Sequence, residues 1–338
     1  MQSVQIVKGM ASYMKPNRQT ISASDRRLSR VLRLGVAVFV IGVLAFAYMY
    51  YKDQYASAGP SMVDRQTESA EQAVKKAPNN IAARLELASA YQLAKRYDDQ
   101  LVQYDEILKA DKTNRFALLG RGGALMAKGD LTAAAVSYHK IADATKKGEF
   151  AGADPQLQEA RYYLGSIALK QGNTKEAITQ LASALKITRS DSDALYLMGV
   201  AQYKAGQTQL SVDALEQALE FVPTGWCEPY SQLNLAYTKL GKVPQATYAA
   251  GMADFCTKKP VEAKRRLNTL TSGPLKVQAL LALGLIAETE SRNPEAISFY
   301  QKVLTVDRKN ASAAASLSRL GVGATPGPKT SSTTQGHS

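Results

Sequence analysis

Two consecutive stretches of 34 residues, 158–191 and 192–225, read QEARYYLGSIALKQGNTKEAITQLASALKITRSD and SDALYLMGVAQYKAGQTQLSVDALEQALEFVPTG. Glycine stands at the eighth and fifteenth positions of both stretches, and a small residue stands at the twentieth. Apolar residues around these positions recur at the spacing of amphipathic helices. The pattern predicts two helices in each stretch, and the second glycine is expected to be the left-handed cap that ends the first helix.

The same register extends in both directions from these two stretches. Further units start near residues 81, 115, 227 and 277, so the six starts are 34, 43, 34, 35 and 50 residues apart. A small residue on the first helix leaves room for a bulky side chain of the second helix, because the two helices pack closely. The eighth position holds Ala88, Gly122, Gly165, Gly199, Asn234 and Gly284, and the bulky partners include Tyr104, Tyr138, Leu181, Leu215 and Tyr300.

This pattern resembles the tetratricopeptide repeat (TPR), a helix–turn–helix unit of 34 residues that stacks into a solenoid. The resemblance covers about residues 62–320, although the tryptophan that the family places in the first helix is missing. It implies an all-α fold, a TPR superhelical solenoid of about six repeats. These are expected near residues 81–114, 115–148, 158–191, 192–225, 227–260 and 277–310.

Segments outside the six units complete the expected solenoid, which runs from residue 64 to residue 320. Residues 64–76 read as a helix that caps the array at its amino-terminal end. An insertion at residues 146–155 either lengthens a helix or forms a loop, and residues 260–270 read as one more helix. Residues 321–338 are expected to be a disordered tail, because they are rich in Gly, Ser, Thr and Pro.

An apolar segment without a charged residue runs from Leu34 to Tyr51, and as a helix it spans about 27 Å, close to the hydrocarbon thickness of a bilayer. Residues 1–33 carry seven Lys or Arg and one acid, whereas the linker at 52–63 has no net charge. The positive-inside rule predicts a single-pass anchor in an inner membrane, with a cytoplasmic basic segment and an extracytoplasmic solenoid. The alternatives are a signal peptide cleaved near Ala56-Ser57-Ala58 and a buried core helix, and the long apolar run favours an uncleaved anchor.

Residues that usually carry catalysis are few in this chain. It has only two histidines, His139 and His337, and two cysteines, and it lacks the glycine-rich phosphate loop and the nucleophile and zinc motifs of common enzymes. We therefore expect no enzyme activity, no metal and no cofactor. The net charge of +13 is typical of nucleic-acid binding, but six of these charges lie in residues 1–33 before the apolar run. We therefore expect no nucleic-acid partner.

The resemblance implies a concave groove that is lined by the first helices of the units and binds a protein or peptide. Apolar side chains fill four of the family's groove positions, and lysines recur at a fifth in units three to five. The groove candidates are Phe116, Leu119, Tyr162, Tyr196, Val200, Tyr203 and Leu235, with Lys170, Lys204 and Lys239. They predict a ligand with apolar side chains and carboxylates. The alternative is that the tyrosines are ordinary packing residues and the lysines complement the helix dipoles.

A clamp for a carboxyl-terminal carboxylate occurs in chaperone-adaptor members of the family. It uses lysine at position five and asparagine at position nine of the first unit, where this chain has Leu85 and Ser89. The resemblance therefore does not extend to that class of client.

The two cysteines lie at opposite ends of the fifth unit. Cys227 opens its first helix and Cys256 lies near the end of its second, and antiparallel helices bring those ends together. A disulfide is therefore geometrically feasible, and closing a loop of roughly 30 residues would stabilise the fold by about 3–4 kcal/mol on the chain-entropy model. The alternative is two small buried hydrophobic residues.

The sequence favours a membrane-anchored scaffold or adaptor that recruits a protein to an envelope assembly, such as a secretion, pilus or cytochrome-maturation machine. One alternative is a holdase-like chaperone that binds the apolar segments of many exported polypeptides. Another is an envelope enzyme with its chemistry in residues 146–157 or 257–275. The oligomeric state, the partner and the pathway do not follow from the sequence.

Overall fold

The computed structural model describes residues 23–53, 61–145, 151–221 and 225–323, which contain helices and turns and no strand. The chain divides into two units, Met1–Ser69 and Ala70–Ser338. Most of the predicted tail, residues 324–338, and half of the insertion, residues 146–150, lie outside the described residues.

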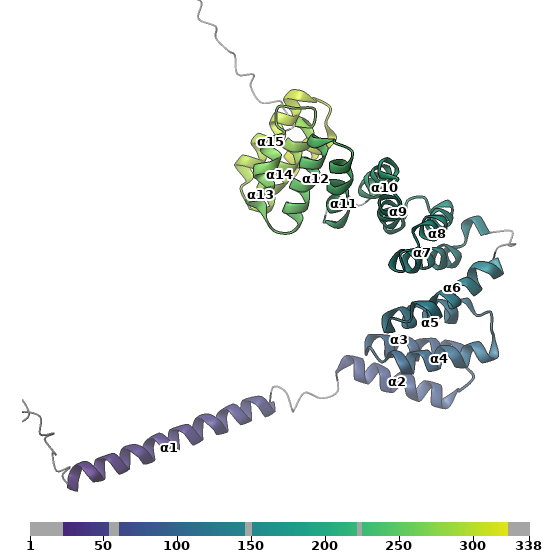
Figure 1. Ribbon diagram of the computed structural model, residues 1–338. Helices are drawn as coiled ribbons and strands as arrows, with labels where there is room; N and C mark the ends of the chain where they lie inside the picture. Colours follow the sequence, from purple (N-terminus) through teal and green to yellow (C-terminus); the bar gives the residue numbers. More distant parts are fainter. Residues whose placement is uncertain (1–22, 54–60, 146–150, 222–224, 324–338) are drawn as a thin grey trace, which may run out of the picture. The chain divides into compact units, whose positions relative to one another are not determined.

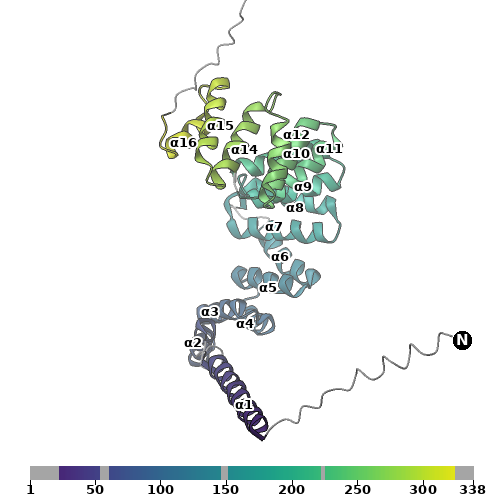
Figure 2. The same ribbon diagram turned by 90° about the vertical axis from the view of Figure 1, so that its left-hand side faces the viewer.

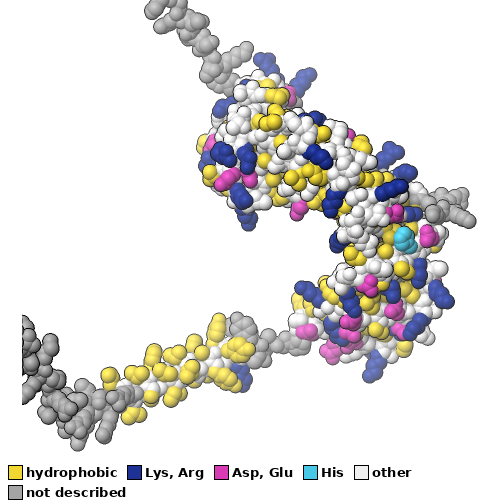
Figure 3. Space-filling view, viewed as in Figure 1, with side chains coloured by type: hydrophobic (Ala, Val, Ile, Leu, Met, Phe, Trp, Pro, Cys, Tyr) yellow, Lys and Arg dark blue, Asp and Glu magenta, His cyan; other side chains and the backbone are white. Residues whose placement is uncertain are grey.

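The first unit contains one long helix, α1 (Ala23–Tyr51), which is about 43 Å long at the rise of an α-helix. Its segment Leu34–Tyr51 has a mean hydropathy of 2.1, and none of that segment is buried. Hydrophobic side chains cover the apolar segment of the helix on the side seen in Figure 3. By length and composition, α1 is a candidate membrane span or signal sequence.

The array of helices begins with α2 (Met62–Lys76), which spans the division between the two units. Six antiparallel pairs follow it, and consecutive helices pack against each other along the array (Figures 1 and 2). The pairs are α3 (Ile81–Leu93) with α4 (Tyr97–Ala110), α5 (Arg115–Lys128) with α6 (Leu131–Thr145), α7 (Pro155–Lys170) with α8 (Thr174–Ile187), α9 (Ser192–Lys204) with α10 (Thr208–Phe221), α11 (Glu228–Lys239) with α12 (Val243–Cys256), and α14 (Lys276–Thr289) with α15 (Asn293–Val306).

Three short elements lie outside these pairs. The 3₁₀ turn η2 (Ala151–Ala153) precedes α7, α13 (Pro260–Asn268) lies between α12 and α14, and α16 (Ala311–Arg319) follows α15. The helix expected at residues 260–270 is therefore present.

Close helix packing explains the glycine at the eighth position of most units. A Cβ atom on Gly199 would lie 2.6 Å from Cγ of Leu215, and one on Gly284 would lie 2.5 Å from Cε1 of Tyr300. Contacts this short do not occur between real side chains, so each first helix approaches its partner at a residue without a side chain. The bulky residues Leu215 and Tyr300 are themselves almost completely buried.

The helix after the insertion begins earlier than the register of the units indicates. α7 starts at Pro155, because Asp154 accepts hydrogen bonds from the backbone N–H groups of Gln156 and Leu157 at 3.0 and 3.1 Å. Asp154 also accepts a hydrogen bond from Arg115 of α5 at 2.6 Å. The amino-terminal end of α7 is therefore tied to the preceding hairpin.

Candidate functional site

The predicted groove tyrosines are half-buried and contribute to the packing between hairpins. Tyr162 of α7 packs against a buried cluster that includes Leu181 and Met198. Tyr196 and Tyr203 of α9 pack against a second cluster, which α10, α11 and α12 form. Burial raises the pKa of Tyr162 to about 12, which is consistent with a ring withdrawn from water. Packing is therefore part of what these tyrosines do.

The other candidates of the first helices differ in exposure. Phe116 and Leu235 have exposed fractions of 65% and 49%, respectively, whereas Leu119 and Val200 are half-buried in packing clusters. We refer to the ten groove candidates together as the first-helix surface. Its members come from α5, α7, α9 and α11.

Two contacts of the first-helix surface bring aromatic and basic groups together. The Nζ atom of Lys239 lies 5.2 Å from the ring centroid of Tyr203, within the range of a cation–π interaction. The ring of Tyr196 lies 5.4 Å from that of Trp226, a residue that the sequence analysis did not select. Lys170 and Lys204 are exposed and form no ion pair within the described residues. Lys170 and Lys204 are therefore available to a carboxylate of a ligand.

The two cysteines lie together at the adjoining ends of α11 and α12. Cys227 is the N-cap residue of α11 and Cys256 is the last residue of α12. Both thiols are free and half-buried. Burial, together with a hydrogen bond to Cys227, raises the pKa of Cys256 to about 12. The geometry therefore supports the proximity that a disulfide requires.

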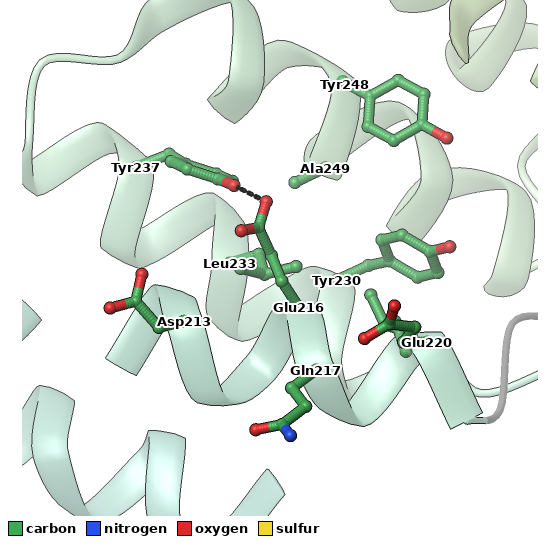
Figure 4. Close-up of a pocket in the computed structure, with 10 residues that line it drawn as sticks. Asp213, Glu216, Gln217, Glu220, Tyr230, Leu233, Tyr237, Tyr248 and Ala249 are labelled. Carbon is green, nitrogen blue, oxygen red and sulfur yellow. Dashed lines mark hydrogen bonds between the residues drawn. The ribbon is translucent and has the colours of Figure 1, made fainter. Parts of the chain in front are cut away.

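A cavity of about 730 Å³ lies where α10, α11 and α12 meet (Figure 4). Carboxylates and amides come from α10, and aromatic rings come from α11 and α12. We call this site the α10–α12 cavity. Its lining residues are Asp213, Glu216, Gln217, Leu219, Glu220, Tyr230, Leu233, Tyr237, Tyr248 and Ala249.

Hydrogen bonds fix two of the three carboxylates in the α10–α12 cavity. The hydroxyl of Tyr237 donates to Oε1 of Glu216, as Figure 4 shows, and Nε2 of Gln209 donates to Oδ1 of Asp213 at 2.8 Å. Burial and the bond to Glu216 raise the pKa of Tyr237, so its hydroxyl stays a donor near neutral pH. No lysine or arginine of the described segments forms an ion pair with these carboxylates.

The α10–α12 cavity was not predicted from the sequence, although part of its signal is visible there. Asp213, Glu216 and Glu220 have the spacing of one helix face, as do Tyr230 and Tyr237. Nothing in the sequence alone indicated that these two faces oppose each other across a junction between hairpins.

Solved structures with similar folds share limited sequence identity with this chain. MamA is 22% identical over 58% of this chain and 96% of its own, with a TM-score of 0.42. YrrB, a TPR protein with an unusual peptide-binding site, is 18% identical over 59% of this chain and 97% of its own, with a TM-score of 0.47. The C-terminal part of a TPR repeat-containing protein from Cytophaga hutchinsonii is 18% identical over 74% and 93%, with a TM-score of 0.47.

These TM-scores are below 0.5, so the neighbours carry no argument about what this chain binds. The chain matches no curated protein.

Three family models match parts of the array. A model described as a TPR repeat matches residues 165–206, and two models described as tetratricopeptide repeats match residues 193–224 and 260–317. Together these matches include both helices of the α9–α10 hairpin and the helices from α13 to α15. The fold built from such repeats serves protein–protein interaction. With its helix pairs joined through close glycine contacts and its matches to three repeat models, this chain contains tetratricopeptide repeats, in residues 165–224 and 260–317.

Proposed function

We propose that this protein is a non-catalytic scaffold that α1 anchors in a bacterial-type inner membrane and that recruits a protein to an envelope assembly. The observation that carries the proposal is the apolar segment Leu34–Tyr51, none of which is buried, in the same chain as a protein-interaction array. The basic segment 1–33 supports a cytoplasmic amino terminus and an extracytoplasmic array.

The first-helix surface is the proposed binding site for the partner. Phe116 and Leu235 offer exposed apolar side chains, and Lys170 and Lys204 offer ammonium groups that pair with no carboxylate of the described segments. A peptide whose apolar side chains alternate with carboxylates complements this combination. Tyr162, Tyr196 and Tyr203 are half-buried members of this surface, and their packing between hairpins holds them in place.

The scaffold role is tested by cross-linking in intact cells, purification of the tagged protein and mass spectrometry of what accompanies it. We expect one reproducible envelope partner with the wild type, and its loss from the double variant Phe116→Ser/Leu235→Ser. Val136→Ser/Leu210→Ser is the matched control, because these side chains are both 51% exposed and lie on the second helices α6 and α10.

The outcomes separate the proposed role from its alternatives. Equal recovery of the partner with both double variants would contradict the role of the first-helix surface. A scatter of unrelated exported proteins would replace the scaffold with a holdase-like chaperone. Exclusively cytosolic partners would contradict the extracytoplasmic array.

A further inference from the structure

The α10–α12 cavity gathers negative charge in a chain whose net charge is +13. Asp213, Glu216 and Glu220 follow one another at spacings of three and four residues, so they project from one face of α10. Glu220 forms neither a hydrogen bond nor an ion pair within the described residues. The rim therefore carries three carboxylates, none of which forms an ion pair within the described residues. The ammonium of Lys242 lies nearby, 5.9 Å from the ring centroid of Tyr237, and donates a hydrogen bond to Gln209 at 3.0 Å.

The opposite wall of the α10–α12 cavity is aromatic. Tyr230 of α11 is 9% exposed, and its hydroxyl has no hydrogen-bond partner among the described residues. Tyr248 of α12 lines the same space, and its hydroxyl also has no such partner. Neither hydroxyl is among the fully buried polar atoms without a partner, so both can be satisfied by water or a ligand in the cavity. Carboxylates facing tyrosine rings form a suitable environment for a flat organic cation.

An earlier junction of the same array shows what such a space can hold. Where α4, α5 and α6 meet, Nε of Arg121 donates to Oδ1 of Asp105 at 2.7 Å and its Nη1 donates to Oγ of Ser137 at 3.0 Å. A guanidinium of the chain itself therefore links the second helices of two neighbouring hairpins at this junction.

The α10–α12 cavity has the same register but lacks that guanidinium. Counted from the start of each unit, Glu216 corresponds to Asp105, Leu233 corresponds to Arg121, and Ala249 corresponds to Ser137. The carboxylate is kept, whereas the two residues that fill the earlier junction are replaced by a shorter apolar chain and a methyl group. Glu216, Leu233 and Ala249 all line the α10–α12 cavity.

We propose that the α10–α12 cavity binds the guanidinium of an arginine side chain that a protein partner supplies. The guanidinium takes the place that Arg121 takes at the earlier junction, donates to Glu216 and Glu220, and stacks against the tyrosine wall. Arginine fits better than lysine, because its planar fork donates to several carboxylate oxygens at once and stacks on aromatic rings.

This site is separate from the first-helix surface. Tyr230, Leu233 and Tyr237 project from one side of α11, whereas Leu235 and Lys239 belong to the first-helix surface. Leu235 is five residues after Tyr230, which places it about 140° around the helix at 3.6 residues per turn. The two sites can therefore fail independently in experiments.

The test uses the full-length protein in detergent micelles with N-acetyl-arginine amide as the probe, observed by saturation-transfer NMR. N-acetyl-citrulline amide is the matched neutral probe, because it has nearly the same shape without the charge. We expect arginine amide to bind at least fivefold more tightly than citrulline amide. We expect Glu216→Gln/Glu220→Gln to remove that difference.

The control variant is Glu86→Gln/Glu262→Gln, which removes the same number of charges from exposed positions that do not line the cavity. It is expected to keep the preference for arginine amide. Equal binding of the two probes to the wild type would overturn the proposal, and so would an equal loss of the preference in both double variants. Neither result depends on the partner of the first-helix surface.

Discussion

In all six hairpins of the described array, a residue one or two positions beyond the end of the first helix has a left-handed backbone. Gly129, Gly172, Gly206 and Gly241 occupy this position in four hairpins, with φ between 68° and 85°. Lys95 and Ser291 occupy it in the other two, with φ of 57° and 59°. A left-handed backbone costs a residue with a side chain about 1–2 kcal/mol. Lys95 and Ser291 adopt it nevertheless, because the turn between the two helices requires it.

Replacement of Ser291 by glycine is expected to stabilise the array, because glycine relieves the left-handed strain. The relief of strain is partly cancelled, because glycine has a larger conformational entropy in the unfolded chain. We therefore expect the free energy of unfolding to rise by about 0.5–1 kcal/mol. The midpoint of urea unfolding measures the change. Ser89→Gly in the middle of α3 is the control, and it is expected to lower the midpoint. A lower midpoint for Ser291→Gly would contradict the prediction.

Gly199→Ala is expected to destabilise the α9–α10 hairpin. Its new Cβ would lie 2.6 Å from Cγ of Leu215 and 3.1 Å from the carbonyl oxygen of Ser211, so a side chain and a backbone must both move. We expect a loss of about 1–3 kcal/mol in urea unfolding.

The matched control for Gly199→Ala is Gly123→Ala in α5. A Cβ at Gly123 meets only the hydroxyl of Tyr138, at 4.0 Å, so alanine there gains helix propensity without a clash. We expect Gly199→Ala to lower the free energy of unfolding and Gly123→Ala to raise it. An equal decrease in both variants would rule out the packing explanation.

At the scale of elements, polar contacts tie consecutive hairpins together. Asp154 caps α7 and pairs with Arg115 of α5, so one carboxylate orders the start of a helix and joins it to the hairpin before the insertion. Within one hairpin, Cys227 and Cys256 bring together the start of α11 and the end of α12. These contacts lie at the ends of helices, where unsatisfied backbone groups require partners.

The pair of Asp154 and Arg115 predicts a dependence of stability on pH. The hydrogen bond from Arg115 holds the pKa of Asp154 below its ordinary value of 3.8. A lowered pKa means that the folded state favours the ionised form of the Asp154 carboxylate. The stability that this carboxylate adds to the fold is therefore complete above pH 3.8, and it is lost as the pH falls through the lower pKa of the folded state. Asp154→Asn keeps the helix cap and removes the charge.

We expect Asp154→Asn to cost about 1 kcal/mol near pH 7 and nothing measurable near pH 2. Urea unfolding of both proteins across this pH range measures the difference. A difference that stays constant down to pH 2 would exclude the ion pair as its source.

The ends of α11 and α12 are expected to become covalently linked in an oxidising compartment. The two thiols are oxidised to a disulfide, and an oxidant such as oxidised glutathione takes up the two electrons and two protons and is reduced to two molecules of glutathione. We expect the bond to raise the free energy of unfolding by about 3 kcal/mol, as closure of a loop of roughly 30 residues allows. Alkylation followed by intact-mass measurement, with and without reductant, detects it.

Cys256→Ser is the control for the disulfide, since it removes one sulfur from the pair. If protein isolated from cells without reductant carries two alkylated cysteines, the disulfide is absent. Either the array is then held in a reducing compartment, or the bond does not form. Oxidised glutathione added to the purified protein distinguishes these two explanations.

At the scale of the whole molecule, the chain joins an apolar helix to a protein-interaction array. The segment Leu34–Tyr51 has no buried residue, whereas each hairpin of the array buries apolar side chains against its neighbours. An apolar helix of this length is stable in a bilayer, where its backbone groups are satisfied within the helix. The proposed function depends on this combination.

Deletion of residues 1–51 is expected to release the protein from the membrane. Full-length protein should stay in the membrane fraction after carbonate extraction, and the shortened protein should appear in the supernatant. Intact-mass measurement of the full-length protein tests cleavage after Ala58 at the same time. Release of the full-length protein by carbonate would contradict anchoring.

The sequence by itself determined the helices and their pairing in hairpins. The spacing of Gly199, Gly206 and Ser211 depends on contacts within one unit of 34 residues, and such contacts recur at fixed positions along the chain. The apolar segment before the array was also visible, because its composition differs from that of every other stretch.

Only the tertiary structure decided which faces of different hairpins oppose each other. The carboxylate of Glu216 faces Tyr237 because α10 and α11 pack at a particular rotation, and that rotation depends on side-chain packing across the junction. The same packing withdraws Tyr162 and Tyr196 partly from solvent, although their positions in the sequence indicated an open surface. Local periodicity encodes helices and hairpins, whereas a cavity between hairpins arises from many weak contacts that the periodicity does not specify.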